Sequence, residues 1–380
     1  MAKKSVLFAL MILLLVNLIV MGQPVMAAEK MPYVDVPITY TGSPIPCRYG
    51  IYLSPGHHMY SEGWHTFTTL VDQRTKGKIK VKEFVGGVLF KANAGFKAVR
   101  GNICDVSPAY PNYSPTGFSL VMGAGLPFMW ENAYVAARAL EELYPKYFKK
   151  DYEALGCKLL LMSSTSNYHL FTNKPVTKLE QLKGMKVRSG GGMLNKLLEG
   201  YGMVPVVVPS PEIYTAMQRG MVDACIFSWA SAQSYKLYEV CKYVTEIGPG
   251  LAAFAPTSGI VNPGWLKKLP PDLKKLVYGA ARETGINISA SYEDHTPGAR
   301  KAFEEHGVKI IKLPPDEVKR WKAAAQPVVD QWVKDMEGKG LPAKQLIKEM
   351  EALNDKYKNF TKQQMLDLQR TNPVPMDKLW

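Results

Sequence analysis

The sequence predicts an α/β protein with largely parallel sheets. Strand-like apolar runs alternate with amphipathic helical segments along most of the chain, which is the pattern of that fold class. The 380 residues are 47% apolar and 21% charged, enough for two ordinary domains with a large core. No internal repeat of fixed period is present, which argues against a solenoid.

The N-terminal segment has the order of a secretory signal. Lys3 and Lys4 begin it, an apolar run from Val6 to Met21 follows, and Val25 to Ala28 supplies the small residues of a cleavage site. We therefore expect residues 1–27 to be a signal peptide and the mature chain to reach the periplasm. An uncleaved membrane anchor is the alternative, but the apolar run is slightly short for a span, and no later run is long enough.

Short strands and helices alternate through the first half of the chain. Apolar spacing predicts strands over residues 49–53, 78–85, 102–106 and 157–162, and helices over residues 62–71, 92–99 and 131–147. Gly77 is expected to end the first of these helices. The segment from Leu120 to Phe128 is a further apolar run.

Two strand–helix units follow side by side in the middle of the chain. Strands are predicted over residues 185–188, 205–208 and 221–227, and helices over residues 193–199 and 212–219. Ser210 suits the N-cap of the second helix and Pro211 its first position. The rest of the chain is helical over residues 273–291, 315–336 and 343–368, with one strand over residues 308–313.

Arg188 is the first candidate binding residue. It closes a predicted strand and precedes the loop from Ser189 to Gly192, which opens a helix. Free backbone N–H groups at a helix start favour an anion, and a guanidinium offers a carboxylate two parallel donors. The pattern indicates an anion site at the carboxyl edge of a sheet. The alternative is an exposed arginine beside a flexible loop; a nucleotide phosphate loop is not supported, because the run is not GxxxxGK[ST].

Aromatic residues stand near several predicted strand ends. They are Tyr110, Phe128, Trp130, Tyr168, Phe227 and Trp229. Such rings can wall a ligand pocket and exclude water, although packing in the core explains any one of them equally well.

A third cluster contains His57, His58, Glu62 and His65, of which the last three fall at positions i, i+4 and i+7 of a possible helix. A metal site there is an alternative, but the motif is not HExxH and further ligands would have to come from elsewhere. We favour a helix start that faces a cleft, with His58 near the ligand. No GxSxG motif is present, and we expect neither a metal nor another cofactor.

The cysteine spacing and the distribution of charge argue against a zinc-binding or a nucleic-acid-binding protein. The five cysteines are widely and irregularly spaced with no CxxC pair, so a zinc site is not indicated, and Cys104 and Cys225 are expected to be buried thiols. The formal net charge is +14, but the basic residues are scattered over helices without interleaved aromatic residues. This argues against nucleic acid and fits the attraction of small anions.

Three motifs occur in order along the chain: Asn173-Lys174-Pro175-Val176, Leu182 to Arg188, and Glu212 to Asp223. Together they resemble the central motifs of DctP-type solute-binding subunits of TRAP (tripartite ATP-independent periplasmic) transporters. The N-terminal part is also similar, in the segments Phe67–Gly77, Gly86–Leu89 and Leu126–Phe128. The resemblance covers the chain from about Tyr49 to Tyr292.

The resemblance implies a two-domain periplasmic-binding-protein fold, type II-like, with mixed sheets, crossing hinge strands and a long inter-domain helix. Domain I would comprise residues 32–165 and 254–293. Domain II would comprise residues 166–253 and 294–380, the latter with a helical C-terminal extension. This tail, from about Ala343, is longer than the family pattern and could cap the second domain or mediate a dimer.

The resemblance also assigns binding residues. Arg188 matches the arginine that pairs with the ligand carboxylate in the family. Tyr168, followed by His169, stands at a second family position that is often arginine. The strand end after Val222-Asp223 implies a pocket contribution from Phe227, Ser228 and Trp229. Because aromatic residues replace polar ones at these positions, we expect a ligand with one carboxylate and an aromatic or apolar body.

The sequence therefore predicts a non-catalytic periplasmic solute-binding protein. It would capture a small organic acid by domain closure and deliver it to the integral membrane subunits of a TRAP transporter, as a monomer or a dimer. The predicted ligand-binding residues are Arg188, Tyr168, His169, Phe227, Ser228, Trp229, Tyr110, Phe128 and His58. The alternatives are a binding protein of an ABC importer or a sensor, and an exported metal-dependent enzyme.

Overall fold

The computed structural model describes residues 31–247 and 256–380. The predicted signal peptide, residues 1–27, lies outside these ranges and stays a prediction. Residues Pro32–Trp380 form one compact unit. Within the described ranges, no helix combines the length and the apolar character that crossing a membrane requires.

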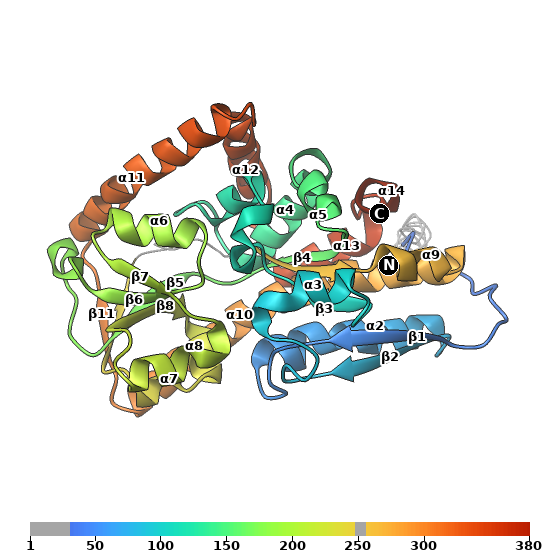
Figure 1. Cartoon of the computed structure of the whole chain (residues 1–380), viewed down its shortest axis with the longest axis horizontal. Coiled ribbons are helices and arrows are strands. Elements are labelled where there is room, and N and C mark those ends of the chain that lie inside the picture. The colour runs from blue at the N-terminus through green and yellow to red at the C-terminus, as the bar shows by residue number, and fades with distance from the viewer. Residues whose placement is uncertain (1–30, 248–255) are drawn as a thin grey trace, which may run out of the picture. The chain divides into compact units, whose positions relative to one another are not determined.

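The first sheet has five strands in the order β2-β1-β3-β10-β4 (Figure 1). Their bounds are β1 Ile45–Gly50, β2 Ile79–Phe84, β3 Val106–Pro108, β4 Lys158–Ser164 and β10 Pro256–Val261. β1 pairs in parallel with β2 and β3, whereas β10 runs antiparallel between β3 and β4. We call this sheet and the helices packed on it the first lobe.

The helices of the first lobe are α2 His65–Thr75, α3 Gly95–Arg100, α4 Ala133–Tyr147, α5 Lys149–Ala154 and α9 Pro263–Lys268. Three of them, α2 to α4, correspond to predicted ones, whereas α5 and α9 were not predicted. Helix α2 ends as predicted, because Lys76 and Gly77 both adopt left-handed backbone angles, with φ of 48° and 74°. The apolar run from Leu120 begins with a 3₁₀ helix, Leu120–Gly125, whose residues are all buried.

The second sheet has six strands in the order β11-β9-β5-β8-β6-β7. Their bounds are β5 Tyr168–Thr172, β6 Lys186–Ser189, β7 Val204–Val207, β8 Ala224–Ser228, β9 Tyr243–Glu246 and β11 Lys309–Lys312. β5 is antiparallel to both β8 and β9, and the other pairs are parallel, so both sheets are mixed. With α6 Met193–Gly200, α7 Ile213–Gln218 and α8 Trp229–Ser234, this sheet forms the second lobe.

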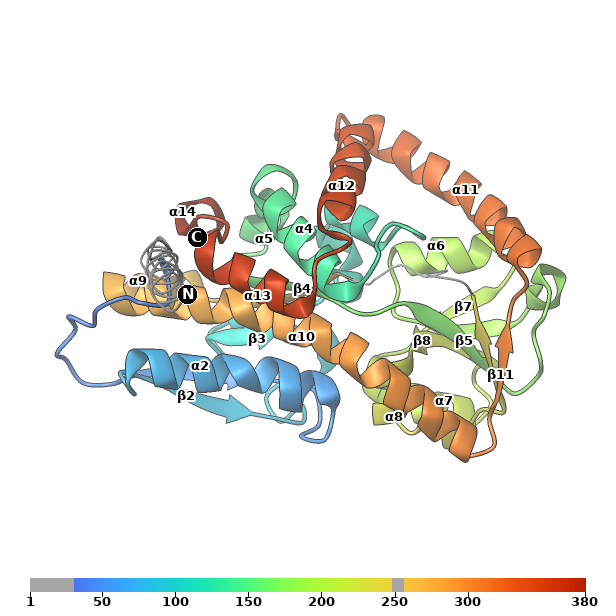
Figure 2. The ribbon, with the colours of Figure 1, turned by 180° about the vertical axis from the view of Figure 1, so that it is seen from behind.

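The longest helix, α10 Pro271–Glu305, belongs to both lobes (Figure 2). Ile288 and Tyr292 pack in the core of the first lobe, whereas Ala299 and Phe303 pack in the core of the second. The sequence predicted only residues 273–291 of this helix. It continues for almost four further turns, because its C-terminal part packs on the core of the second lobe. The helix continues despite Pro297 in its interior.

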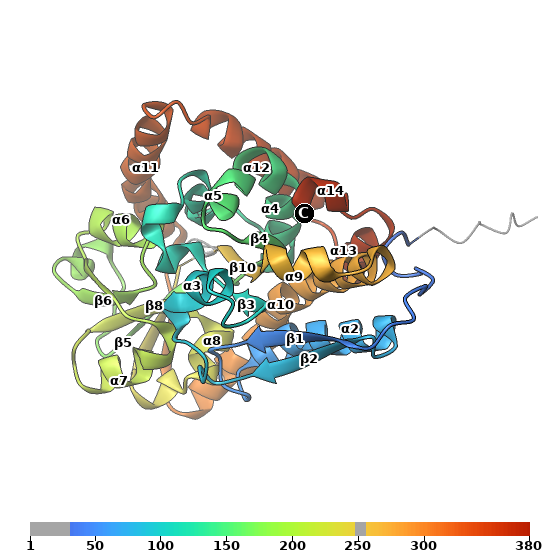
Figure 3. The ribbon, with the colours of Figure 1, turned by 45° about the vertical axis from the view of Figure 1, so that its right-hand side comes forward.

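The C-terminal helices are α11 Pro315–Glu337, α12 Ala343–Tyr357, α13 Lys362–Thr371 and α14 Met376–Leu379. Helix α11 packs on both lobes, because its Trp321 lies in the core of the second lobe and its Trp332 in the core of the first. Helices α12 to α14 pack on the first lobe, although they were expected as an extension of domain II. Leu346, Met350 and Leu379 share one core with Leu140 and Tyr144 of α4, and α13 lies beside α10 (Figure 3). The domain boundaries otherwise stay a prediction.

The helix predicted over residues 343–368 is two helices. Thr361 accepts a hydrogen bond from the backbone N–H of Gln364 and thereby begins α13, so the chain turns before it. The five cysteines are all buried and unpaired, which confirms the prediction for Cys104 and Cys225.

Candidate ligand-binding site

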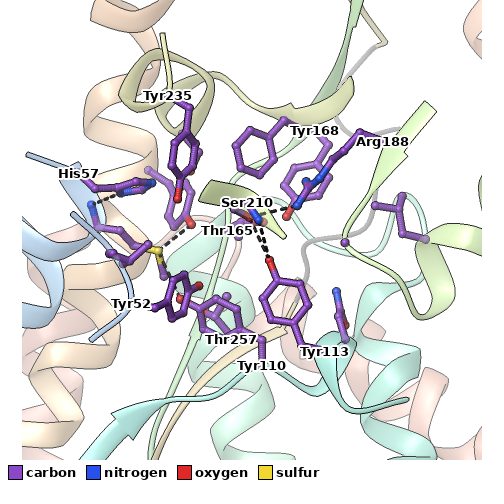
Figure 4. Close-up of a pocket in the computed structure, with 18 residues that line it drawn as sticks. Tyr52, His57, Tyr110, Tyr113, Thr165, Tyr168, Arg188, Ser210, Tyr235 and Thr257 are labelled. Atoms are coloured by element: carbon purple, nitrogen blue, oxygen red, sulfur yellow. Dashed lines mark hydrogen bonds between the residues drawn. The ribbon is translucent and has the colours of Figure 1, made fainter. Parts of the chain in front are cut away.

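A cavity lies between the two lobes (Figure 4). Side chains from the first lobe, from the segments that join the lobes and from α10 line one part of it: Tyr52, Leu53, His57, Met59, Tyr110, Asn112, Tyr113, Thr165, Thr257 and Tyr292. The second lobe supplies Tyr168, Arg188, Gly190, Leu194, Ser210, Phe227, Ser231 and Tyr235. The wall is therefore rich in aromatic rings and hydroxyl groups.

Arg188, at the end of β6, is the one charged residue among these lining residues. It is 2% exposed, its Nε donates to the carbonyl oxygen of Val208 at 2.8 Å, and its Nη2 donates to Ser210 Oγ at 3.1 Å. Its guanidinium carbon lies 5.0 Å from the centre of the Phe227 ring. Within the described part of the chain no carboxylate forms an ion pair with it. Because buried charges are normally paired, this arginine is suited to an anion that enters the cavity.

The glycine loop after β6 contributes less than the sequence predicted. Gly190 lines the cavity, but the backbone N–H of Gly191 is already bound to Ser189 Oγ at 3.0 Å. Gly191 and Gly192 have φ of 88° and 65°, a conformation that favours glycine. These two residues and the start of α6 border a separate groove.

The sequence predicted Ser210 as the N-cap of the following helix, but in the structure Ser210 joins the two lobes instead. Its hydroxyl lies 3.0 Å from the Tyr113 hydroxyl of the first lobe and accepts from Arg188. The backbone N–H of Ser210 also donates to Tyr113 Oη at 3.3 Å. The N-cap prediction was wrong because Ser210 opens a 3₁₀ turn, Ser210–Glu212, and its side chain is drawn to the arginine.

Three predicted aromatic residues lie on the cavity wall with Arg188. They are Tyr110, Tyr168 and Phe227. The rings of Tyr168 and Phe227 are 5.9 Å apart, and Tyr110 packs edge-on against Tyr52 at 5.8 Å. Burial raises the pKa of Tyr168 to about 12, so its hydroxyl stays neutral and can donate to a ligand.

Four other predicted residues do not line this cavity. Trp229 is 1% exposed and packs on Phe171 and Phe303 in the core of the second lobe, and the His169 ring lies 5.7 Å from Trp229. Ser228 is fully buried, and Phe128 packs beneath the Lys322 ammonium group in a different groove. The sequence placed them near strand ends, but only the tertiary fold decides which side chains turn toward the cavity.

His58 lies one layer behind the cavity wall. Its Nδ1 is 3.1 Å from Ser291 Oγ, and its Nε2 is 3.5 Å from the hydroxyl of Ser231, which does line the cavity. The His58 ring stacks on the His57 ring at 4.8 Å. Within this segment, the neighbouring His57 is the residue that reaches the cavity wall.

The structure separates the three residues considered for a metal. Glu62 pairs with His295 Nε2 at 3.0 Å, whereas His65 Nδ1 pairs with Glu83 at 3.1 Å. Within residues 31–247 and 256–380, no group of three or more His, Cys, Asp or Glu side chains is placed to hold a metal ion.

Sequence reasoning missed most of the tyrosine wall. Tyr52, Tyr113, Tyr235 and Tyr292 come from four separate segments and meet only in the folded chain. The single available signal is the number of tyrosines, 20 in the whole sequence, which says nothing about where they meet.

The buried histidines predict how stability depends on pH. Burial lowers the pKa of His57 to about 3 and that of His169 to about 4, whereas the unfolded chain takes up a proton near pH 6.5. The stability that these neutral rings contribute is complete above pH 6.5 and is lost as the pH falls toward 4. We expect the free energy of unfolding to fall by about 1.4 kcal/mol per pH unit for each such histidine.

Urea unfolding between pH 7 and pH 5 measures this slope. His169→Phe, which keeps a ring beside Trp229, should reduce the slope. Equal slopes in the two proteins would show that folding does not lower the pKa of His169.

Comparison with known proteins places the chain in a family. Residues 49–335 match the model of the DctP family, bacterial extracellular solute-binding protein family 7. A solute-binding protein of Albidiferax ferrireducens is 28% identical over 271 residues, which cover 68% of this chain and 77% of that protein. The 2,3-diketo-L-gulonate-binding periplasmic protein YiaO of Escherichia coli is 26% identical over 249 residues, covering 64% and 74%.

A solved structure shows the same architecture. The TRAP periplasmic solute-binding protein of Bordetella bronchiseptica, crystallised with mandelate, superposes with a TM-score of 0.77 at 24% identity, over 82% of this chain and 99% of that one. This confirms the predicted two-domain periplasmic-binding-protein fold. The family match spans most of the chain and includes all three motifs that suggested it. The protein is thus a member of the DctP family of extracellular solute-binding proteins, the binding subunits of TRAP transporters.

Proposed function

We propose that this protein captures a small monocarboxylate with an aromatic or apolar body and delivers it to the integral membrane subunits of a TRAP transporter. The observation that carries the proposal is Arg188, a buried guanidinium without a carboxylate partner in the described chain, at the wall of an aromatic cavity. A single buried cation balances one carboxylate; a second carboxylate would be buried without a counter-charge.

The ligands of related proteins support this class. The structures with the same fold include one with bound mandelate and one from Rhodoferax ferrireducens with copurified benzoate, and both ligands are aromatic monocarboxylates. The neutral tyrosine hydroxyls around Arg188 add donors without adding charge.

Capture would involve closure of the two domains. We infer that domain I, residues 32–165 and 254–293, moves against domain II, residues 166–253 and the first part of 294–380. The hydrogen bond between Tyr113 and Ser210 is a contact that closure would form and opening would break. We also infer that residues 1–27 direct the chain to the periplasm and are removed there.

A thermal-shift experiment tests the ligand class. The mature protein is first unfolded and refolded to remove copurified ligand, then heated with benzoate, mandelate, phenylacetate, succinate or malate. A ligand at a hundred times its Kd stabilises the folded state by about 2.7 kcal/mol, so a bound acid raises Tm by several degrees. We expect a shift with aromatic monocarboxylates. A larger shift with the dicarboxylates, or none with any acid, would contradict the proposal.

A further inference from the structure

The cavity has a second polar end, remote from Arg188. His57 and Tyr235 form it, and Figure 4 shows both on the opposite side of the cavity from the guanidinium. His57 is only 2% exposed, yet its ring lines the cavity, and it meets the Tyr235 ring edge-on at 5.0 Å. Neither residue belongs to the motifs that the sequence shares with the family.

The hydrogen bonds of His57 fix the position of its proton. Its Nδ1 accepts the backbone N–H of Met59 at 3.1 Å, so the neutral ring carries its hydrogen on Nε2. Burial lowers the pKa of His57 to about 3, which keeps the ring neutral. No side chain or carbonyl in the described chain accepts a hydrogen bond from Nε2. The ring therefore presents one uncharged donor that a ligand can use.

Tyr235 offers a second group of the same kind. Its hydroxyl is buried and forms no hydrogen bond within the described residues. Burial raises its pKa, so the hydroxyl stays protonated. A buried polar group without a partner costs free energy, and an oxygen atom of a ligand would remove that cost for both residues.

An aromatic wall connects the two polar ends. The Arg188 guanidinium lies over Phe227 at 5.0 Å, and the Phe227 and Tyr235 rings stack at an interplanar angle of 30° with centres 6.1 Å apart. The Tyr235 ring then meets His57. A flat ligand that places its carboxylate at Arg188 would extend along these rings toward the imidazole.

We propose that His57 and Tyr235 recognise an uncharged oxygen at the end of the ligand remote from its carboxylate. The ligand class is then an aromatic monocarboxylic acid that carries a hydroxyl, ether or carbonyl oxygen on its ring or side chain. This inference rests on the proposed function, because the carboxylate at Arg188 sets the orientation of the ligand. A second carboxylate at the distal end is disfavoured, since no cation lies there among the lining residues.

Isothermal titration with matched acids tests the inference. Phenylacetate is compared with its 3-hydroxy and 4-hydroxy derivatives, and benzoate with its two hydroxy derivatives. We expect the wild type to bind at least one hydroxylated acid about tenfold or more tighter than its parent. His57→Phe removes one of the two donors and keeps a ring, so the ratio of the two affinities should fall to about threefold or less.

A second variant is needed in case His57→Phe does not fold, because that substitution also removes the acceptor of the hydrogen bond from the Met59 N–H. Tyr235→Phe deletes a single hydroxyl and should lower the same ratio about threefold or more. Wild-type protein that binds both acids equally, or variants that keep the wild-type ratio, would overturn the inference and leave the proposed function intact. Failure of every acid to bind the wild type would overturn both.

Discussion

Replacing Arg188 with methionine is expected to weaken binding of the organic acid by about thirtyfold or more. Removing one partner of a buried charge pair costs about 2–5 kcal/mol, and each 1.4 kcal/mol is about a factor of ten in affinity. The side chain is 2% exposed, so water cannot replace it once the ligand is bound. Titration calorimetry with the tightest-binding acid of the thermal-shift panel measures the loss.

The unliganded protein should respond in the opposite direction. Arg188 is a buried cation whose bonds are to Val208 and Ser210, with no carboxylate among the residues described. An apolar side chain of similar length relieves the cost of burying the charge, so the free energy of unfolding should stay equal or rise. A residue whose loss abolishes binding without loss of stability serves the ligand rather than the fold.

Two further variants sharpen this result. Arg219→Met removes an exposed arginine of the same lobe and should leave affinity close to that of the wild type, which excludes a general effect of net charge. Arg188→Lys keeps the charge but loses the planar pair of donors, so its affinity should lie between the wild type and Arg188→Met. Binding by Arg188→Met within threefold of the wild type would refute the role of this arginine.

The sequence could predict a site residue only where the neighbouring residues in the chain determine its position. Arg188 was identified because it ends a strand before a glycine loop, and Tyr168 and Phe227 because they lie close to strand ends. Trp229 stands near the same strand end as Phe227 but packs inward, because a strand end allows either direction. His57 and Tyr113 could not be found in this way, since their partners come from the opposite lobe.

The fold, too, could be predicted only where the sequence carries a local signal. Helices with a clear apolar face, such as α4 and α6, were predicted to within about two residues. The short strands β5 and β9 were missed, because four or five residues buried in a mixed sheet show no periodicity of their own. The docking of the C-terminal helices on α4 also has no local signal: it depends on contacts across more than 200 residues, such as Gln369 with Glu141.

Those C-terminal contacts surround the charge pair with the largest expected effect on stability. Glu141 of α4 and Arg282 of α10 form an ion pair of 2.7 Å, with side chains 1% and 0% exposed. Arg282 also donates to the carbonyl of Leu160, and its guanidinium carbon lies 4.5 Å from the centre of the Tyr278 ring. Gln369 of α13 donates to Glu141 at 3.2 Å, so the pair connects three helices.

Glu141→Ala should lower the free energy of unfolding by about 3–5 kcal/mol, because it leaves the Arg282 guanidinium buried without a counter-charge. Urea unfolding at pH 7 measures the loss. The double variant Glu141→Leu with Arg282→Met replaces both charges with apolar side chains of similar size and should recover most of the stability, since a buried ion pair contributes little relative to such a replacement. A double variant as unstable as Glu141→Ala would show instead that the charges themselves hold α4, α10 and α13 together. Recovery would show that the cost arises from the unpaired cation.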